Sequence, residues 1–166
     1  MSEFINTVDS IEDKVLTNSI IDRSITEIRD NYATFIGSSA FHGCSALTTV
    51  DFPAVINIKD EAFYSCSELT IADFQVATNI GDYAFYICYK LTSLILRSET
   101  MATLNGSSAF ASTPIASGTG YIYVPSSLID SYKTASNWST YAAQFRALED
   151  YTVDGTTTGA LDESKI

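Results

Sequence analysis

The sequence predicts a solenoid of parallel β-strands built from 22-residue repeats, and two observations support this prediction. First, the motif Ala-Phe-x-x-Cys-x-x-Leu occurs at Ala40–Leu47, Ala62–Leu69 and Ala84–Leu91. Second, the phenylalanines, the cysteines and the final leucines of these copies are each spaced by 22 residues. A fixed short period is the signature of a repeat architecture, in which each coil packs only on its neighbours.

Each repeat is expected to contribute one strand with the pattern L-x-x-L-x-L. The segments that carry it are Ile25–Asp30, Leu47–Phe52, Leu69–Phe74 and Leu91–Leu96. Positions one, four and six point into the coil, and positions two, three and five face solvent. With its 22-residue period, the chain is predicted to be a leucine-rich-repeat solenoid, mostly parallel β with short helical turns.

The return half of each repeat predicts a second short strand around the register mates Ile58 and Ile80. The segments Asp60–Phe63 and Asp82–Phe85 then predict one helical turn each, capped by the aspartate. The fourth repeat is modified, because Phe110 follows Phe85 by 25 residues instead of 22. An atypical last repeat is expected where a stack ends.

The flanking segments are assigned by their place in the stack. Residues 25–124 are the predicted solenoid, and residues 1–24 are predicted to cap its first coil. The apolar spacing in that cap fits both a helix and short strands. Residues 150–166 are acidic and rich in threonine, which predicts an extended tail.

Residues 125–149 predict a helical cap at the C-terminal end of the solenoid. A first helix would follow Ser126 or Ser127 as its N-cap. A second helix is predicted from the spacing of its apolar residues, which places one stripe on the open end of the core. That stripe consists of Trp138, Tyr141, Ala142, Phe145 and Leu148.

Composition excludes several classes of partner. Twenty acidic residues against nine basic ones give a formal net charge of −11, which repels phosphate backbones and anionic headgroups. We therefore expect neither nucleic-acid binding nor membrane insertion. The segment Met1–Asn6 has no features of an export signal, so we expect none. The three cysteines are interpreted as small buried hydrophobes, with a disulfide or a metal site as alternatives.

The sequence shows no catalytic motif, so we predict a non-enzymatic protein without cofactor or metal. The single histidine, His42, occupies the repeat position of Tyr64 and Tyr86 and is interpreted as a variable surface position. Carboxylates pair along the stack, Asp51 with Asp73 and Asp60 with Asp82. We interpret them as solvated ladder mates, with a weak cation site as the alternative.

Two surfaces are candidate binding sites. The first is the outward strand face, where apolar residues such as Ile71 and Ile95 often mark a contact. The residues predicted to bind there are Thr48, Thr49, Asp51, Thr70, Ile71, Asp73, Thr92, Ser93 and Ile95. The second is a set of tyrosines on the return side, Tyr64, Tyr83 and Tyr86 with Tyr89 nearby. Tyrosine gives a large contact area at low entropic cost, which suits recognition of sugars or protein.

The repeats, over roughly residues 20–115, resemble the BspA-type leucine-rich repeat of bacterial surface and phage-associated proteins. The flanks resemble the leader and the ending of short members encoded in phage and prophage tail regions. The leader is Phe4–Asp9 with Ser19–Arg23, and the ending is Tyr121–Glu149. The resemblance implies a non-enzymatic solenoid used in adhesion or recognition.

The resemblance therefore predicts a structural or host-recognition component of a phage or prophage virion. Its expected partners are other virion proteins, or a protein or glycan on a host surface, and a homo-oligomer is possible. The alternative is a bacterial surface or secreted adhesin module that binds host protein or glycan.

Overall fold

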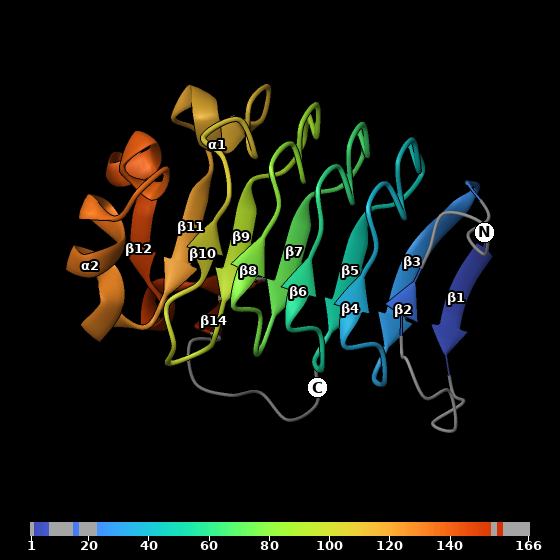
Figure 1. Cartoon of the computed structure of the whole chain (residues 1–166), viewed down its shortest axis with the longest axis horizontal. Coiled ribbons are helices and arrows are strands. Elements are labelled where there is room, and N and C mark those ends of the chain that lie inside the picture. Colours follow the sequence, from blue (N-terminus) through green and yellow to red (C-terminus); the bar gives the residue numbers. More distant parts are fainter. Residues whose placement is uncertain (1, 7–14, 17–22, 154–155, 158–166) are drawn as a thin grey trace.

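The computed structural model describes residues 2–6, 15–16, 23–153 and 156–157. It consists of two parallel sheets that face each other across one core (Figure 1). The seven-stranded sheet contains, in spatial order, β1 (Ser2–Asn6), β3 (Ile25–Asp30), β5 (Thr49–Phe52), β7 (Ile71–Phe74), β9 (Ser93–Leu96), β11 (Tyr121–Val124) and β12 (Phe145–Ala147). The five-stranded sheet contains β2 (Val15–Leu16), β4 (Phe35–Ile36), β6 (Asn57–Ile58), β8 (Asn79–Ile80) and β10 (Thr103–Leu104), again in spatial order.

The register confirms the predicted solenoid, because equivalent residues of successive repeats lie side by side. Val50 pairs with Ala72 in the larger sheet, and Ile58 pairs with Ile80 in the smaller one. The predicted return strand is therefore present. At the N-terminal end, β1 pairs with β3 and β2 pairs with β4, which selects strands where the sequence left two options open. The rest of the predicted cap (residues 1, 7–14 and 17–22) lies outside the described residues.

A column of phenylalanines runs through the core. The rings of Phe41, Phe63, Phe85 and Phe110 stack with successive centroid distances of 5.1, 5.1 and 5.4 Å, and all four are fully buried. Phe110 keeps its place in the column because the extra residues of the last repeat lie outside it, two of them before β10 and one between β10 and Phe110, as the 24-residue offset between β8 and β10 shows. Stacked, fully buried rings are a large share of the apolar area that drives folding.

The cysteines form a second buried column, which confirms that they are small core residues. No disulfide joins these three cysteines, which all lie in the described part of the chain. The thiol of Cys66 donates to the carbonyl of Phe41 at 3.1 Å, and that of Cys88 donates to Phe63 at 3.2 Å. These two thiols thus satisfy carbonyls of the preceding coil, whereas the sulfur of Cys44 accepts from the Arg23 guanidinium at 3.1 Å.

The predicted helical turns around Phe63 and Phe85 are wrong. Each phenylalanine is flanked, two residues before and two after, by residues in the left-handed region. For the central repeat these are Glu61 (φ 60°) and Ser65 (φ 63°). Left-handed residues do not propagate a right-handed helix, so the chain makes successive tight turns instead. The Asp60 carboxylate caps no helix and instead accepts the backbone N–H of Asp82 in the next coil at 2.8 Å.

The C-terminal cap is only partly helical. The first helix is present as a 3₁₀ turn, Ser126–Leu128, followed by α2 (Ile129–Thr134), but no serine side chain caps it. The predicted second helix is wrong beyond Gln144. A 3₁₀ segment covers Trp138–Gln144, and Phe145–Ala147 then forms β12, because these residues pair in parallel with β11.

The last described residues follow the 3₁₀ turn Leu148–Asp150 and form two short antiparallel strands, β13 (Thr152–Val153) and β14 (Thr156–Thr157). The rest of the predicted tail lies outside the described residues. Within the part of the chain that the structure describes, no helix has the length and apolarity to cross a bilayer.

Candidate functional site

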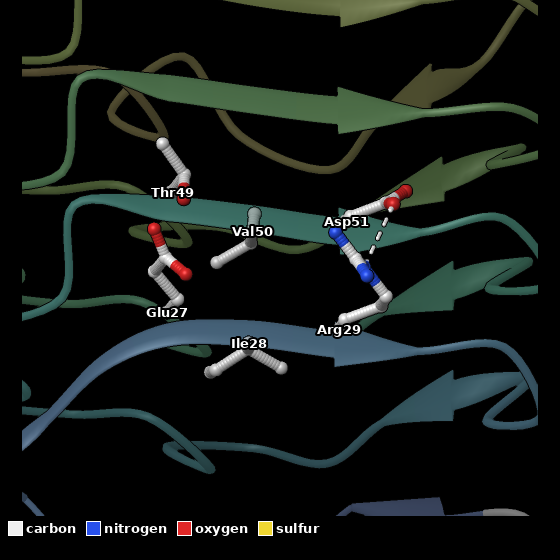
Figure 2. Close-up of a pocket in the computed structure, with 6 residues that line it drawn as sticks. All are labelled: Glu27, Ile28, Arg29, Thr49, Val50 and Asp51. Atoms are coloured by element: carbon white, nitrogen blue, oxygen red, sulfur yellow. Dashed lines mark ion pairs between the residues drawn. The ribbon is translucent and has the colours of Figure 1, made fainter. Parts of the chain in front are cut away.

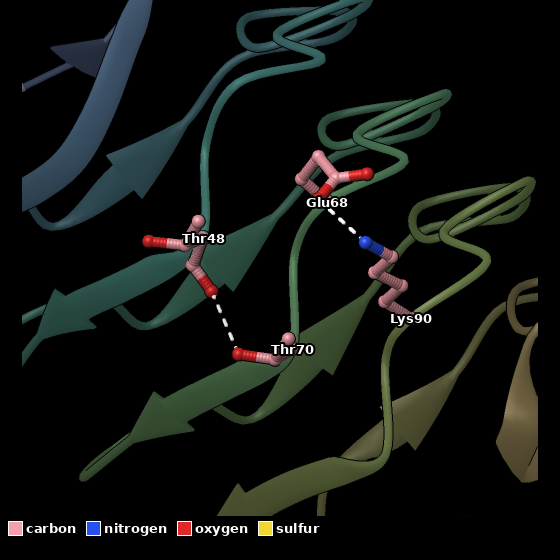
Figure 3. A network of polar contacts seen from close by, with 4 residues as sticks. All are labelled: Thr48, Glu68, Thr70 and Lys90. Atoms are coloured by element: carbon pink, nitrogen blue, oxygen red, sulfur yellow. Dashed lines mark hydrogen bonds and ion pairs between the residues drawn. The ribbon is translucent and has the colours of Figure 1, made fainter.

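The position-two threonines of the outward strand face form hydrogen bonds within the sheet. The hydroxyl of Thr48 donates to the carbonyl of Thr26 at 3.0 Å, and Thr70 donates to Thr48 at 3.1 Å (Figure 3). Thr92 continues the ladder to Thr70 at 3.4 Å. Because these hydroxyl protons already bond within the sheet, the threonine ladder serves first to hold neighbouring coils in register.

Charged side chains at position five of three coils (Arg29, Asp51 and Asp73) form a row across the same face, and Arg97, just after β9, joins it. Arg97 makes a two-point contact with Asp73, with N–O distances of 2.9 and 3.0 Å. Arg29 lies 3.9 Å from Asp51, a looser pair. Burial and the neighbouring Asp73 carboxylate raise the pKa of Asp51, against the two arginines, which lower it. The charges of this row are therefore largely balanced within the protein.

A shallow pocket opens beside the first pair of this row, between β3 and β5 (Figure 2). Its lining comprises Glu27, Ile28, Arg29, Thr49, Val50 and Asp51, around a volume of about 120 Å³. This is smaller than the 300–1,000 Å³ typical of ligand sites. Of the predicted binding residues, Thr49 and Asp51 line this pocket.

The prediction that Ile95 belongs to the outward binding face is wrong, because its side chain is fully buried. Its strand neighbours at the same position are Asp73 and Tyr123. The ring of Tyr123 packs against Tyr151 at 5.0 Å, and Tyr151 is itself 6% exposed. The chain after the cap thus folds back over this end of the strand face. Ile71 and Ser93 remain partly exposed on the coils before it.

The tyrosines of the return side form a partly exposed column of rings, as the shared repeat position predicts. His42 stacks on Tyr64 at 4.7 Å with an interplanar angle of 12°, and Tyr64 lies 4.9 Å from Tyr86. Tyr83 stands perpendicular to Tyr86 at 5.4 Å and is 40% exposed, while Tyr89 is 61% exposed. We call these five residues the tyrosine edge.

The backbone holds the tyrosine edge rigidly. The amide after each ring donates to the ring residue of the next coil: Gly43 to Tyr64, and Ser65 to Tyr86, both at 2.8 Å. These turns line the upper border of the solenoid in Figure 1, where α1 (Pro114–Ser117) also lies. Side chains on a hydrogen-bonded frame are pre-organised, so binding costs them little ordering entropy.

Electrostatics around the tyrosine edge are acidic. The pKa of Tyr64 is raised, first by partial desolvation and then by electrostatic repulsion from the neighbouring groups Tyr86, Glu61, Tyr83 and Tyr89. The nearby cation Lys90 is already paired with Glu68 at 2.7 Å (Figure 3). No cluster of three or more histidine, cysteine, aspartate or glutamate residues suited to a metal is present among the residues that the structure describes.

The sequence did not predict the roles of two residues in these candidate surfaces. His42 was assigned to the surface, and it also extends the ring column, which its shared position with Tyr64 already signalled. Arg97 balances Asp73, but it sits 24 residues later, off the repeat register, so no periodic signal could reveal it.

The sheets, the ring column and the flat outward faces define a leucine-rich-repeat solenoid. A BspA-type leucine-rich repeat region matches residues 9–137 in six copies, and the chain belongs to this family. Proteins of the family are typically non-enzymatic, and leucine-rich-repeat domains generally mediate protein binding.

A solved leucine-rich repeat protein from Bacteroides ovatus is similar to this chain at 20% identity, with a TM-score of 0.49. The match covers 74% of this chain and 36% of that protein, so the chain spans about a third of its length. No curated protein matches the sequence.

Proposed function

We propose that this chain is a non-enzymatic recognition protein that binds through the exposed surface of its repeats, as a tail-associated component of a phage or prophage particle. One observation carries the recognition role. The rings of His42, Tyr64 and Tyr86 stack coil by coil on a rigid frame, and Tyr83 and Tyr89 beside them are exposed, although the fold does not need these rings for its core.

The particle assignment is supported by the flanking segments. The leader Phe4–Asp9 with Ser19–Arg23 and the ending Tyr121–Glu149 resemble those of short members from phage and prophage tail regions. The ending also forms the cap that closes the last coil, so it belongs to the same folded unit. Virion proteins or a host-surface protein or glycan are the partners that such a component would bind.

The experiment that tests this proposal is fractionation of induced particles. Purified virions would be digested and searched for peptides of this chain, with a cytoplasmic enzyme as the contamination control. We expect the chain to co-sediment with particles and to resist removal by salt. Its absence from particles, with recovery in the cell envelope, would replace the virion role by that of a surface adhesin.

The mass of the native protein gives an independent measurement. Light scattering at two ionic strengths distinguishes a salt-stable oligomer, as expected for a particle building block, from a monomer. A monomer at both ionic strengths would contradict a role as a repeated building block and would favour a free recognition module.

A further inference from the structure

The tyrosine edge has binding capacity that the fold leaves unused. Within the described residues, no protein group hydrogen-bonds to the tyrosine hydroxyls of this edge. Those hydroxyls belong to Tyr64, Tyr83, Tyr86 and Tyr89. The strand face differs, because its threonine hydroxyls and position-five charges already have partners in the sheet. The tyrosine edge is therefore the better candidate surface.

Ring geometry limits what this edge can bind. The two faces of Tyr64 are covered, by His42 on the side of the preceding coil and by Tyr86 on the side of the next. A sugar that lies flat on an aromatic face therefore finds no room on the central ring. Tyr83 and Tyr89, the most exposed rings, leave aromatic surface open to solvent.

The charges beside these rings favour a cation. Glu61 is the ladder mate of Tyr83 in the preceding coil, and its carboxylate faces the same border. Asp82 precedes Tyr83 and accepts its backbone N–H at 3.0 Å. Cations bind over aromatic faces, and carboxylates nearby strengthen the attraction. The net charge of −11 adds long-range steering toward basic partners.

We propose that the tyrosine edge binds a basic polypeptide segment, with its arginine or lysine side chains against Tyr83 and Tyr89 and beside Glu61. This inference rests on the proposed recognition function and deepens it by naming the surface and the chemical class of the partner. Arginine suits the site best, because its planar guanidinium stacks on aromatic rings and pairs with carboxylates.

The test uses the full chain and a capped hexa-arginine peptide as the probe, with binding followed by fluorescence anisotropy. The double variant Tyr83→Ala/Tyr89→Ala removes two exposed rings without changing the charge. We expect about a tenfold loss of affinity, since each exposed cation–π contact contributes a modest share of the binding free energy. Glu61→Gln should weaken binding at low salt and have less effect at high salt.

The matched control is Ile56→Ala/Val76→Ala, which removes apolar side chains that are 43% and 41% exposed outside the tyrosine edge. It should bind the peptide like the wild type, and thermal unfolding should show that all variants are folded. Equal losses in both double variants, or no loss in either, would overturn the proposal. Binding of neutral chitotetraose with an affinity matching that of the peptide would overturn it in favour of a glycan.

The same variants separate this inference from the proposed function. If Tyr83→Ala/Tyr89→Ala loses the peptide but still co-sediments with particles, the edge binds a partner other than its particle neighbours. If the wild type co-sediments with particles but never binds the peptide, only the basic partner is wrong. Failure of the wild type to co-sediment contradicts the virion role alone.

Discussion

At the scale of single residues, the phenylalanine column carries much of the stability. Phe63 is fully buried and stacks between Phe41 and Phe85 at 5.1 Å on each side. Phe63→Ala should lower the free energy of unfolding by about 3–5 kcal/mol, because it opens a cavity in a packed core. Urea denaturation measures this. Tyr89→Ala, at an exposed ring, is the control and should stay within about 0.5 kcal/mol of the wild type. An unchanged midpoint for Phe63→Ala would contradict the column.

Gly81 is required by the close approach of two coils. A Cβ at this position would overlap the backbone nitrogen and the Oδ1 atom of Asp60 in the preceding coil. Gly81→Ala should therefore destabilise the protein by about 1–3 kcal/mol, the usual cost of overpacking. Adding Asp60→Ala should not restore stability, because the backbone clash remains. Full recovery in the double variant would show that only the carboxylate is in the way.

The buried thiols predict a loss of stability in alkali. Burial raises the pKa of Cys88 from its ordinary value of 9.0 to about 12, and the pKa of Cys66 is also well above 9.0, through the hydrogen bond with Cys44 and through burial. Below pH of about 9 both thiols are protonated whether the chain is folded or not, so their contribution is complete. As pH rises from there, the unfolded chain loses protons first.

The free energy of unfolding should then fall by about 1.4 kcal/mol per pH unit for each thiol, up to the folded pKa. Urea titrations at a series of pH values measure the slope. Cys88→Ala should be less stable at neutral pH and should show a shallower alkaline slope than the wild type. Parallel slopes would mean that Cys88 titrates normally in the folded protein.

At the scale of elements, the cap ends the smaller sheet by means of side chains. The outer edge of β10 has no further strand among the described residues, and three cap residues instead bond to the backbone of β10 and of Ala102 just before it. Tyr132 accepts the N–H of Ala102 at 2.8 Å, Trp138 donates to the Ala102 carbonyl at 2.7 Å, and Asn137 donates to Leu104 at 2.7 Å. An edge sealed in this way is protected from pairing with another chain.

Tyr132→Phe tests the contribution of these hydrogen bonds between the cap and the sheet edge. It leaves the buried N–H of Ala102 without its partner and should cost about 1–3 kcal/mol, the penalty for an unsatisfied buried donor. Tyr123→Phe is the matched control, since no protein group among the described residues bonds to its hydroxyl. Chemical denaturation of both variants gives the comparison. Equal stabilities would mean that water replaces the lost contact.

The sequence predicts those elements that recur with the 22-residue period. The four strands β3, β5, β7 and β9, the return strands β6 and β8, and the columns of Phe63 and Cys66 follow from it. The strand at Phe145–Ala147 does not, because apolar spacing fitted a helix and only pairing with β11 decides otherwise. The turns also escape prediction, since a left-handed Glu61 leaves no compositional signal.

The candidate site also has one part that the repeat pattern predicts and one part that it does not. Stacking of Tyr64 on its neighbours follows from the repeat position, and so does the threonine ladder that includes Thr70. Ile95 is buried between Asp73 and Tyr123, and Tyr123 packs against Tyr151, which returns from outside the repeats. The repeat pattern cannot predict a contact of this kind, because the two residues are far apart in the sequence and one of them lies outside the repeats.

At the scale of the whole molecule, each coil contacts only its neighbours, so one complete repeat should be removable. Deletion of residues 64–85 joins Phe63 to Tyr86 and keeps all later residues in register, because 22 residues are lost. Phe63 then stacks on Phe110, and Asp60 takes the place of Asp82 beside Gly106. Stability in such arrays is a sum of repeat and interface contributions, so the shortened chain should fold with a lower melting temperature.

The control deletion removes residues 65–85, which is one residue fewer. It leaves three residues instead of two between Phe63 and Cys88, so these two side chains cannot both keep their places in the core columns without distorting the tight turn that joins them. Circular dichroism and thermal unfolding should show a cooperative β protein for the first deletion and no cooperative transition for the second. If both deletions folded equally well, the coils would be tolerant of register and the phenylalanine column would not be the element that aligns them.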